Sequence, residues 1–315
     1  MFDGRPVICV GCAFWDTIFK IKELPSRGIK VLPERVVQSA SGMATAAAVT
    51  IARLGGAVDL WARVGDDAAG ESFLKDLARE TVRTGSIRIV PGARTAISTI
   101  LVDDAGERIV VPYTDSSLDS DPSWLPLPNV AEASAVLADM RWPEAARASF
   151  AETRRRNIPS VLDADVAAPD LLREMIALAD HVLFSEVALQ SLVPHSSPQD
   201  ALRKIVKGLR AKVVGVTLGA AGALIWQRDT EDGRIRRFPS IPIDAVDTLN
   251  AGDIWHGVYV YGLACNWDIE RTVKMANIAA AMKCEHFGGR NGAPYLAELL
   301  ERSRALIPTM QEMRV

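Results

Sequence analysis

Residues 247–253 read Asp247-Thr248-Leu249-Asn250-Ala251-Gly252-Asp253, and they run directly into a helix-like segment over residues 254–263. Small residues let backbone N–H groups come close to a ligand, and the first turn of a helix offers N–H donors without intrahelical partners. Such a turn stabilises the negative charge of a phosphoryl group. The Asp253 carboxylate at this turn can accept a proton from an attacking hydroxyl. A plain helix N-terminus with an acidic first turn is the alternative interpretation of this fragment alone.

Upstream of this turn, short apolar runs alternate with helical patterns, which is typical of an α/β fold with a mainly parallel sheet. The buried strands are expected at residues 7–10, 58–64, 135–138, 159–162, 181–184 and 212–217. The helices are expected at residues 44–54, 68–80, 142–156 and 199–209, and another begins near residue 251. The pattern predicts one doubly wound domain over residues 1–315.

Two segments interrupt this alternation. Residues 17–21 pair with 30–38 around one turn, and residues 95–102 pair with 108–113 around a polar turn that Gly106 closes. We expect both pairs to form a small β-sheet lid from about residues 16–39 and 94–114. Such a lid would cover the carboxyl edge of the parallel strands, where α/β proteins bind ligands. Two ordinary surface hairpins are the alternative.

The composition excludes several classes of protein. The formal net charge of −3 over 315 residues argues against a general nucleic-acid binder, because such proteins carry a basic excess. Apolar runs fall short of the roughly 18–20 residues that cross a bilayer, so we expect no membrane partner. Residues 1–10 lack the pattern of a secretory signal, and four cysteines do not make a disulfide scaffold in this length. We therefore expect a cytoplasmic globular protein.

Two glycine-containing loops accompany the turn. The run Val216-Thr217-Leu218-Gly219-Ala220-Ala221-Gly222 follows an expected strand, and its turn suits backbone contact with the phosphates of a nucleotide. A second loop, residues 288–294, follows a helix of small residues at 275–282. The first strand is not followed by Gly-x-Gly-x-x-Gly, which disfavours a dehydrogenase.

In this order and spacing, the motifs resemble those of the ribokinase-like PfkB carbohydrate kinases. Residues 247–253 look like the family signature DTxGAGD, Ser41-Gly42 occupies its Gly-Gly turn, and residues 63–67 match its RVGDD segment. The resemblance implies a ribokinase-like doubly wound fold, with a mainly parallel sheet flanked by helices and a small β-sheet lid. It implies ATP-dependent phosphorylation of a sugar hydroxyl with Mg²⁺. A monovalent cation such as K⁺ is a further candidate cofactor, and a homodimer through the lid is a candidate assembly.

The resemblance also assigns roles to individual residues. Asp253 would be the catalytic base, and the N–H groups of Ala251, Gly252 and Asp253 would form an anion hole in the turn that Asn250 begins. The sugar would contact Asp16, Ser41 and Gly42. The nucleotide would contact Thr217, Gly219, Gly222, Asn277 and Gly289.

The sequence departs from the family pattern at the turn and at the metal motif. Asn250 replaces the first glycine of the signature, and we expect activity to survive because the anion hole uses later backbone groups. The family's Asn-x-x-Glu motif falls at residues 185–188, where both marker residues are missing. Glu186, Asp163 or Asp165 would then hold Mg²⁺ through water, since this ion keeps several waters and needs few protein ligands.

Lys30 and Arg141 bear on the substrate. Lys30 lies in an expected lid strand and Arg141 follows the expected strand 135–138, so both are placed to bind an anionic group of a sugar; solvated surface cations are the alternative. Stretches 137–142, 161–165, 184–186 and 282–294 look most similar to sulfofructose kinase, where matching Lys and Arg residues hold the sulfonate. An Asn that helps there is Pro112 here. A 6-phosphosugar, an uncharged ketose, a nucleoside or a catalytically silent sugar-binding regulator remain the open alternatives.

Overall fold

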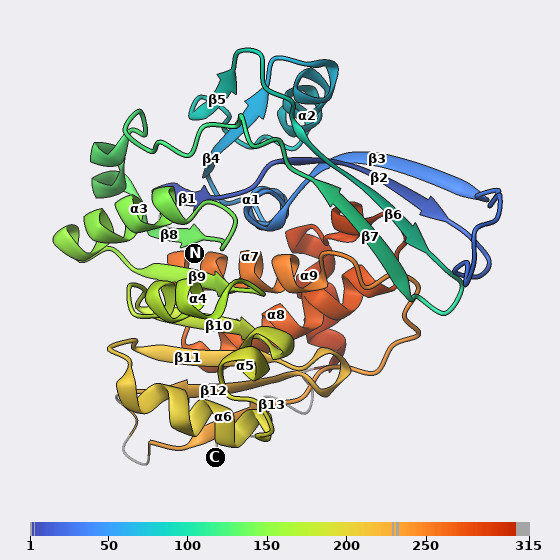
Figure 1. The fold of residues 1–315 in the computed structure, drawn as a ribbon. Helices are drawn as coiled ribbons and strands as arrows, with labels where there is room; N and C mark the ends of the chain where they lie inside the picture. Colours follow the sequence, from blue (N-terminus) through green and yellow to red (C-terminus); the bar gives the residue numbers. More distant parts are fainter. Residues whose placement is uncertain (1, 3, 229, 231–232, 307–315) are drawn as a thin grey trace.

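The computed structural model describes residues 2, 4–228, 230 and 233–306. In this part of the chain a nine-stranded sheet runs in the order β13-β12-β11-β10-β9-β8-β1-β4-β5 (Figure 1). Its strands are β1 Val7–Val10, β4 Val58–Gly65, β5 Ile87–Val90, β8 Ala135–Ala138, β9 Ser160–Ala164, β10 His181–Ser185, β11 Val213–Thr217, β12 Ala223–Gln227 and β13 Ile235–Phe238. The pairs from β5 to β11 are parallel, whereas β12 and β13 form an antiparallel edge. The six predicted strands are confirmed, and β5, β12 and β13 are additional.

Helices cover both faces of this sheet (Figure 1). They are α1 Met43–Arg53, α2 Ala68–Arg79, α3 Pro143–Arg156, α4 Pro169–Ile176, α5 Glu186–Leu192, α6 Pro198–Ile205, α7 Ala251–Ala264, α8 Ile269–Cys284 and α9 Leu296–Leu306, with short 3₁₀ turns η1 Leu127–Glu132, η2 Val206–Gly208, η3 Gly219–Ala221 and η4 Gly289–Gly292. Alternate residues of β1 enter two cores: Val7 and Cys9 pack with α1, α7 and α8, and Ile8 and Val10 pack with α3 to α6. Burial on both faces explains why the parallel strands are apolar throughout.

No helix in the described part of the chain combines the length and the apolar composition that crossing a bilayer requires.

A second sheet, in the order β3-β2-β6-β7, projects from the edge of the domain (Figure 1). It consists of β2 Phe14–Lys20, β3 Arg35–Ser41, β6 Ala96–Val102 and β7 Arg108–Tyr113, and β2 pairs with β6 in parallel. The β6–β7 hairpin lies where the sequence predicted it. The first pair forms as well, between β2 and β3, but its second strand begins at Arg35 instead of residue 30. Pro33 has no N–H for a sheet ladder, and Lys30 is left outside the strand.

Strand β7 presents different side chains to the two faces of this lid sheet. Arg108, Val110 and Pro112 line a cavity beneath the lid. Ile109, Val111 and Tyr113 alternate with them and are solvent-exposed. The lid therefore has an inner face toward the main domain and an apolar outer face.

Candidate active site

A cavity of about 670 Å³ lies between the lid and the carboxyl ends of the parallel strands. It brings together most of the residues that the sequence singled out, although they come from distant parts of the chain. From these predictions it gathers Asp16, Ser41, Gly42, Arg141, Asp163, Asp165, Thr217, Asn250, Ala251, Gly252 and Asp253. The cavity lies at the edge of the sheet where ligands were expected, because the parallel strands all end there.

The turn before α7 carries the Asp253 carboxylate, and the Ala251 amide in this turn donates to the Thr248 carbonyl at 3.3 Å. Asn250 adopts the left-handed conformation, with φ of 61°, immediately before the helix begins at Ala251. Asparagine tolerates this conformation better than most residues, which explains how it can replace a glycine here. Its Nδ2 donates a 2.7 Å hydrogen bond to Oδ2 of Asp253. The N-terminus of α7 thus faces the cavity together with the Asp253 carboxylate.

The pKa of Asp253 is raised to about 6. Loss of solvation raises it most, the hydrogen bond from Asn250 opposes that effect, and the nearby carboxylates of Asp165, Asp139 and Asp16 raise it further. A carboxylate with this pKa is mostly ionised at neutral pH and is more basic than an ordinary aspartate. It therefore suits a general base that works near neutrality.

Asp247 anchors the other end of the turn. Its Oδ1 accepts a 2.8 Å hydrogen bond from the Leu249 amide, and its Oδ2 accepts bonds from the amides of Gly288 and Gly289, at 3.0 and 2.9 Å. The predicted nucleotide contact Gly289 is buried, and a Cβ added to it would lie 2.8 Å from Oδ1 of Asn250. In this structure Gly289 supports the turn from behind, and its amide is already used by Asp247.

The predicted sugar-binding residues lie at the lid end of the cavity. Asp16 is buried in β2 and accepts a hydrogen bond from Ser98 on β6. Burial raises its pKa, and the hydrogen bond from Ser98 opposes this. Ser41 and Gly42 line the same end, where β3 leads into α1. A carboxylate among hydroxyl groups is suited to bind the hydroxyls of a sugar.

Two arginines enter the cavity, and one of them was not predicted. Arg108 on β7 donates from Nη1 to Oγ1 of Thr248, and Arg141 donates to Oδ2 of Asp165 at 2.8 Å and to the Val166 carbonyl at 2.7 Å. Lys30, which was expected here, is exposed and does not line the cavity. The signal for Arg108 was the period-two pattern of residues 108–113, which places Arg108 on the same face as Val110.

The predicted nucleotide turn borders this cavity at Thr217, and its Gly222 packs against Phe238, which lines a smaller cavity. Thr217 lines the main cavity, and η3 follows it with Gly219 exposed. A Cβ on Gly222 would lie 2.0 Å from the Phe238 carbonyl oxygen, so this position requires glycine. The smaller cavity, of about 450 Å³, has a largely apolar lining that includes Phe238, Pro239, Ser240, Ile241, Asn277 and Ile278.

Asn277 is committed to contacts within the protein. Its Oδ1 accepts a 2.8 Å bond from Trp255 Nε1, and its Nδ2 donates to the carbonyls of Phe238 and Pro239. The side-chain amide thus fixes a wall of the smaller cavity. Asn277 therefore acts on that cavity by positioning its wall.

The carboxylates proposed for Mg²⁺ are only partly assembled. Asp163 and Asp165 line the cavity at the end of β9, and Glu186 does not; Gln190 donates to its carboxylate on α5. Burial and then the neighbouring carboxylates of Asp253, Asp165 and Asp139 raise the pKa of Asp163. Within the described residues, no group of three or more His, Cys, Asp or Glu side chains could hold a metal directly. The clustered negative charge fits a cation bound through water and phosphate.

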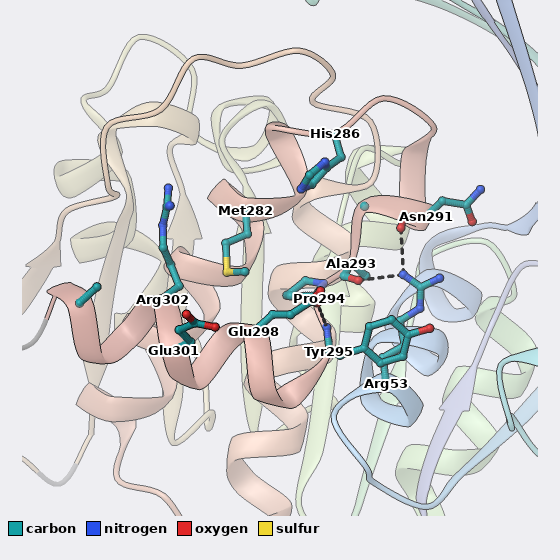
Figure 2. A pocket seen from close by; sticks show the side chains of 12 residues that line it. Arg53, Met282, His286, Asn291, Ala293, Pro294, Tyr295, Glu298, Glu301 and Arg302 are labelled. Carbon is teal, nitrogen blue, oxygen red and sulfur yellow. Dashed lines mark hydrogen bonds between the residues drawn. The ribbon is translucent and has the colours of Figure 1, made fainter.

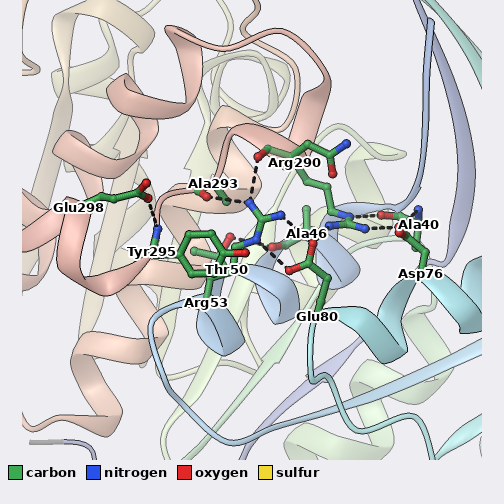
Figure 3. A network of polar contacts seen from close by, with 11 residues as sticks. Ala40, Ala46, Thr50, Arg53, Asp76, Glu80, Arg290, Ala293, Tyr295 and Glu298 are labelled. Carbon is green, nitrogen blue, oxygen red and sulfur yellow. Dashed lines mark hydrogen bonds and ion pairs between the residues drawn. The ribbon is translucent and has the colours of Figure 1, made fainter.

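A network of buried charged side chains joins the end of lid strand β3 to the loop after α8 (Figure 3). The fully buried guanidinium of Arg290 contacts Asp76, Glu80 and the Ala40 carbonyl. Arg53 donates to the same Glu80 carboxylate, with Nη2 at 2.6 Å from Oε1. These contacts hold η4, α1, α2 and β3 together behind the site.

A separate cavity of about 700 Å³ lies beside α9 (Figure 2). Its lining includes Arg53, Met282, His286, Tyr295 and Arg302. None of the described residues 247–253 lines it, so this cavity is distinct from the predicted site.

Comparisons with known proteins agree with this fold. Residues 6–296 match the family described as pfkB family carbohydrate kinase. The ribokinase of Lactococcus lactis subsp. lactis (strain IL1403) is 26% identical over 303 residues, covering 95% of this chain and 97% of that protein. The solved structure of a candidate ribokinase from Agrobacterium tumefaciens is 37% identical with a TM-score of 0.93, covering 97% of this chain and 99% of that chain.

Arabidopsis thaliana ribokinase, solved in complex with ribose and ATP, has a TM-score of 0.81 at 21% identity, covering 95% of this chain and 98% of that chain. Its likeness extends the agreement in fold. With its fold, its 247–253 turn and the family match in agreement, this chain belongs to the pfkB family of carbohydrate kinases, phosphotransferases that act on an alcohol group.

Proposed function

We propose that this kinase transfers the γ-phosphoryl group of ATP to a hydroxyl of a sugar that carries an anionic group, such as sulfofructose or a 6-phosphosugar. One observation carries the choice of an anionic sugar: Arg108 and Arg141 line the same cavity as Asp16 and Asp253. A guanidinium binds sulfonate or phosphate oxygens with a planar pair of N–H donors. An uncharged pentose gives Arg108 no charged partner, whereas Arg141 already pairs with Asp165.

The proposed reaction uses the 247–253 turn. Asp253 accepts the proton of the acceptor hydroxyl, whose oxygen forms a bond to the γ-phosphorus while the bond to the β-phosphate oxygen breaks and ADP leaves. The N–H groups of Gly252 and Asp253 stabilise the charge on the transferring group, and that of Ala251 does so once it exchanges its 3.3 Å bond to the Thr248 carbonyl for the phosphate. A Cβ at Gly252 would meet open space among the described residues, which leaves room for a close phosphate.

Thr217 in the main cavity and Gly222, packed against Phe238 of the smaller cavity, suggest where the nucleotide lies. We propose that the base occupies the 450 Å³ cavity beside Phe238 and that the phosphates pass Gly219 toward Asp253. Asp163 and Asp165 would hold Mg²⁺ through water. When bound, Mg²⁺ would neutralise charge on the phosphates. Arg141 keeps Asp165 in place through its 2.8 Å contact.

Strand β7 supports an acceptor that is larger than ribose. Arg108 and Pro112 project from the same face of this strand, so the lid presents a cation and an apolar surface to the cavity. Pro112 has no side-chain amide, unlike the Asn that sulfofructose kinase is expected to have at this place. The anionic group would lie between Arg108 and Arg141. The sugar hydroxyls would reach Asp16 on the neighbouring strand β2.

A substrate panel that follows ADP release tests this proposal. It should include sulfofructose, fructose 6-phosphate, fructose, ribose and nucleosides, each with the native protein and with Asp253→Asn. We expect the highest kcat/KM for an anionic sugar and loss of turnover in the variant. A preference for ribose or fructose would contradict the anionic acceptor, and a preference for nucleosides would contradict the sugar. Absence of turnover with every acceptor would point to the catalytically silent alternative.

A further inference from the structure

Lys283, in the last turn of α8, is completely buried, and so is Asp247. Its ammonium contacts three oxygens: the Asp247 carbonyl, Oδ2 of Asp247 at 3.1 Å and the His286 carbonyl at 3.4 Å. An ammonium has three N–H donors, so these contacts match its capacity. A buried charge of this kind is costly unless it is paired and hydrogen-bonded, as it is here.

The oxygens around Lys283 are the kind that bind a dehydrated monovalent cation. Proteins that select K⁺ surround it with backbone carbonyls that replace its water. Here the Lys283 ammonium already fills the position between these oxygens. The K⁺ that the family resemblance suggested therefore does not fit at this place.

The ammonium holds the start of the phosphate turn. Asp247 is the first residue of the 247–253 segment, and the amides of Val246 and Asp247 both donate to the Cys284 carbonyl, next to Lys283. The carboxylate of Asp247 in turn fixes Leu249 and the loop that begins at Gly288. One charged contact thus joins α8, the turn and this loop.

The charge states agree with an internal ion pair. Burial would raise the pKa of Asp247, but the Lys283 ammonium and the amides that bind its carboxylate outweigh this, and the pKa lies below its usual value. Burial lowers the pKa of Lys283, while Asp247 opposes that change. Besides the ammonium, three amides donate to the Asp247 carboxylate and stabilise its ionised form.

We propose that Lys283 is the built-in monovalent cation of this kinase: its ammonium neutralises Asp247 and orders the phosphate turn, so the enzyme needs no K⁺. Lys283 is a positioning residue, because it touches the turn and not the reacting atoms. The proposal rests on the kinase activity of the family and is independent of which sugar is the acceptor.

The first test compares the native protein in KCl, NaCl and choline chloride at equal ionic strength. We expect kcat/KM to differ by less than about twofold among the three salts and the melting temperature to stay the same, because equal ionic strength gives equal screening. Stimulation by K⁺ that choline does not reproduce would overturn the proposal. The melting measurement needs no sugar, so it remains decisive if the proposed acceptor is wrong.

The second test removes the ammonium. Lys283→Ala opens a space among the same oxygens, and we expect kcat to fall about 10²-fold because the turn is displaced. K⁺, NH₄⁺ or methylammonium should then restore activity and raise the melting temperature. Lys283→Met, which fills the space with apolar atoms, should respond less. Lys75→Ala, an exposed lysine paired with Glu71 on α2, is the matched control.

A double variant covers the case in which the single variants fail to fold. Asp247→Asn/Lys283→Met removes both charges at once and leaves no unpaired buried ion, which is the usual cause of severe destabilisation. We expect a folded protein with reduced kcat and no response to cations. Native kcat in this variant, or in cation-free Lys283→Ala, would show that the ammonium does not order the turn.

Discussion

Asn250 and Asp253 are joined by a 2.7 Å hydrogen bond from Nδ2 to Oδ2, across the turn that begins α7. The glycine that the resemblance to the family signature implies at position 250 would have no side chain to make this bond. The bond opposes the loss of solvation that raises the pKa of Asp253 to about 6. The side chain at position 250 therefore adjusts the basicity of the proposed catalytic base.

Replacing Asn250 with glycine should move the acid limb of the activity profile to higher pH. Glycine adopts the left-handed conformation of this position freely, so the turn should keep its shape. The lost hydrogen bond stabilised the ionised carboxylate, and its removal therefore raises the pKa of Asp253. The measurement is kcat/KM against pH for both proteins. An unchanged acid limb would show that Asn250 does not tune the base.

Asp253→Asn should reduce phosphoryl transfer about 10²–10⁴-fold, the usual cost of losing a general base. In the native protein, the base must be ionised to accept a proton, so kcat/KM should fall as pH decreases through about 6. Stopped or coupled assays of ADP release across this range measure both effects. ATP binding followed by calorimetry is the control, and it should survive the substitution. A native profile that is flat from neutral to acid pH would contradict Asp253 as the base.

The sequence predicted the parallel sheet and the phosphate turn because both depend on local patterns. The strands are buried on both faces and are therefore apolar, and the turn has a distinctive order of small and acidic residues. The prediction that Lys30 lies in a lid strand was wrong, because β3 begins after Pro33, which has no N–H for a sheet ladder. The role of Lys283 depends on Asp247, which is 36 residues away, and within its own helix it looks like an ordinary surface lysine.

Arg108→Ala should raise KM for an anionic acceptor about 10–10²-fold, in line with the loss of a charged hydrogen bond. Its effect on KM for an uncharged sugar should be smaller, because no ion pair is lost. Arg141→Ala should behave similarly, whereas Lys30→Ala should change little because Lys30 lies outside the cavity. Steady-state kinetics with a charged and an uncharged acceptor make the comparison. Equal effects of Arg108→Ala on both acceptors would contradict recognition of an anion.

The outer face of the lid carries Ile97, Ile109, Val111 and Tyr113, which are 44%, 38%, 60% and 51% exposed. We propose that two copies pair through this apolar face, since exposed sheets tend to recruit partners. Val111→Asp should then shift the protein from dimer to monomer in light scattering over a concentration series. Ile89→Asp, an exposed position on β5 outside the lid, is the matched control. A native protein that is monomeric throughout the series would refute the pairing.

Gly222→Ala should destabilise the fold and weaken nucleotide binding together. Gly222 has a φ of 87°, and a Cβ there would lie 2.0 Å from the Phe238 carbonyl oxygen and 2.6 Å from the Ser240 amide nitrogen. Strain at such a backbone position costs about 1–3 kcal/mol, and the overlap with the 238–240 segment adds to it. That segment forms the wall of the 450 Å³ cavity, so ATP affinity should fall as the wall moves. Gly85→Ala, where a Cβ would meet open space among the described residues, should change the unfolding free energy by less than about 0.5 kcal/mol. Denaturant unfolding and calorimetric ATP titration measure the two effects, and a Gly222→Ala protein that loses stability but keeps native ATP affinity would place the nucleotide elsewhere.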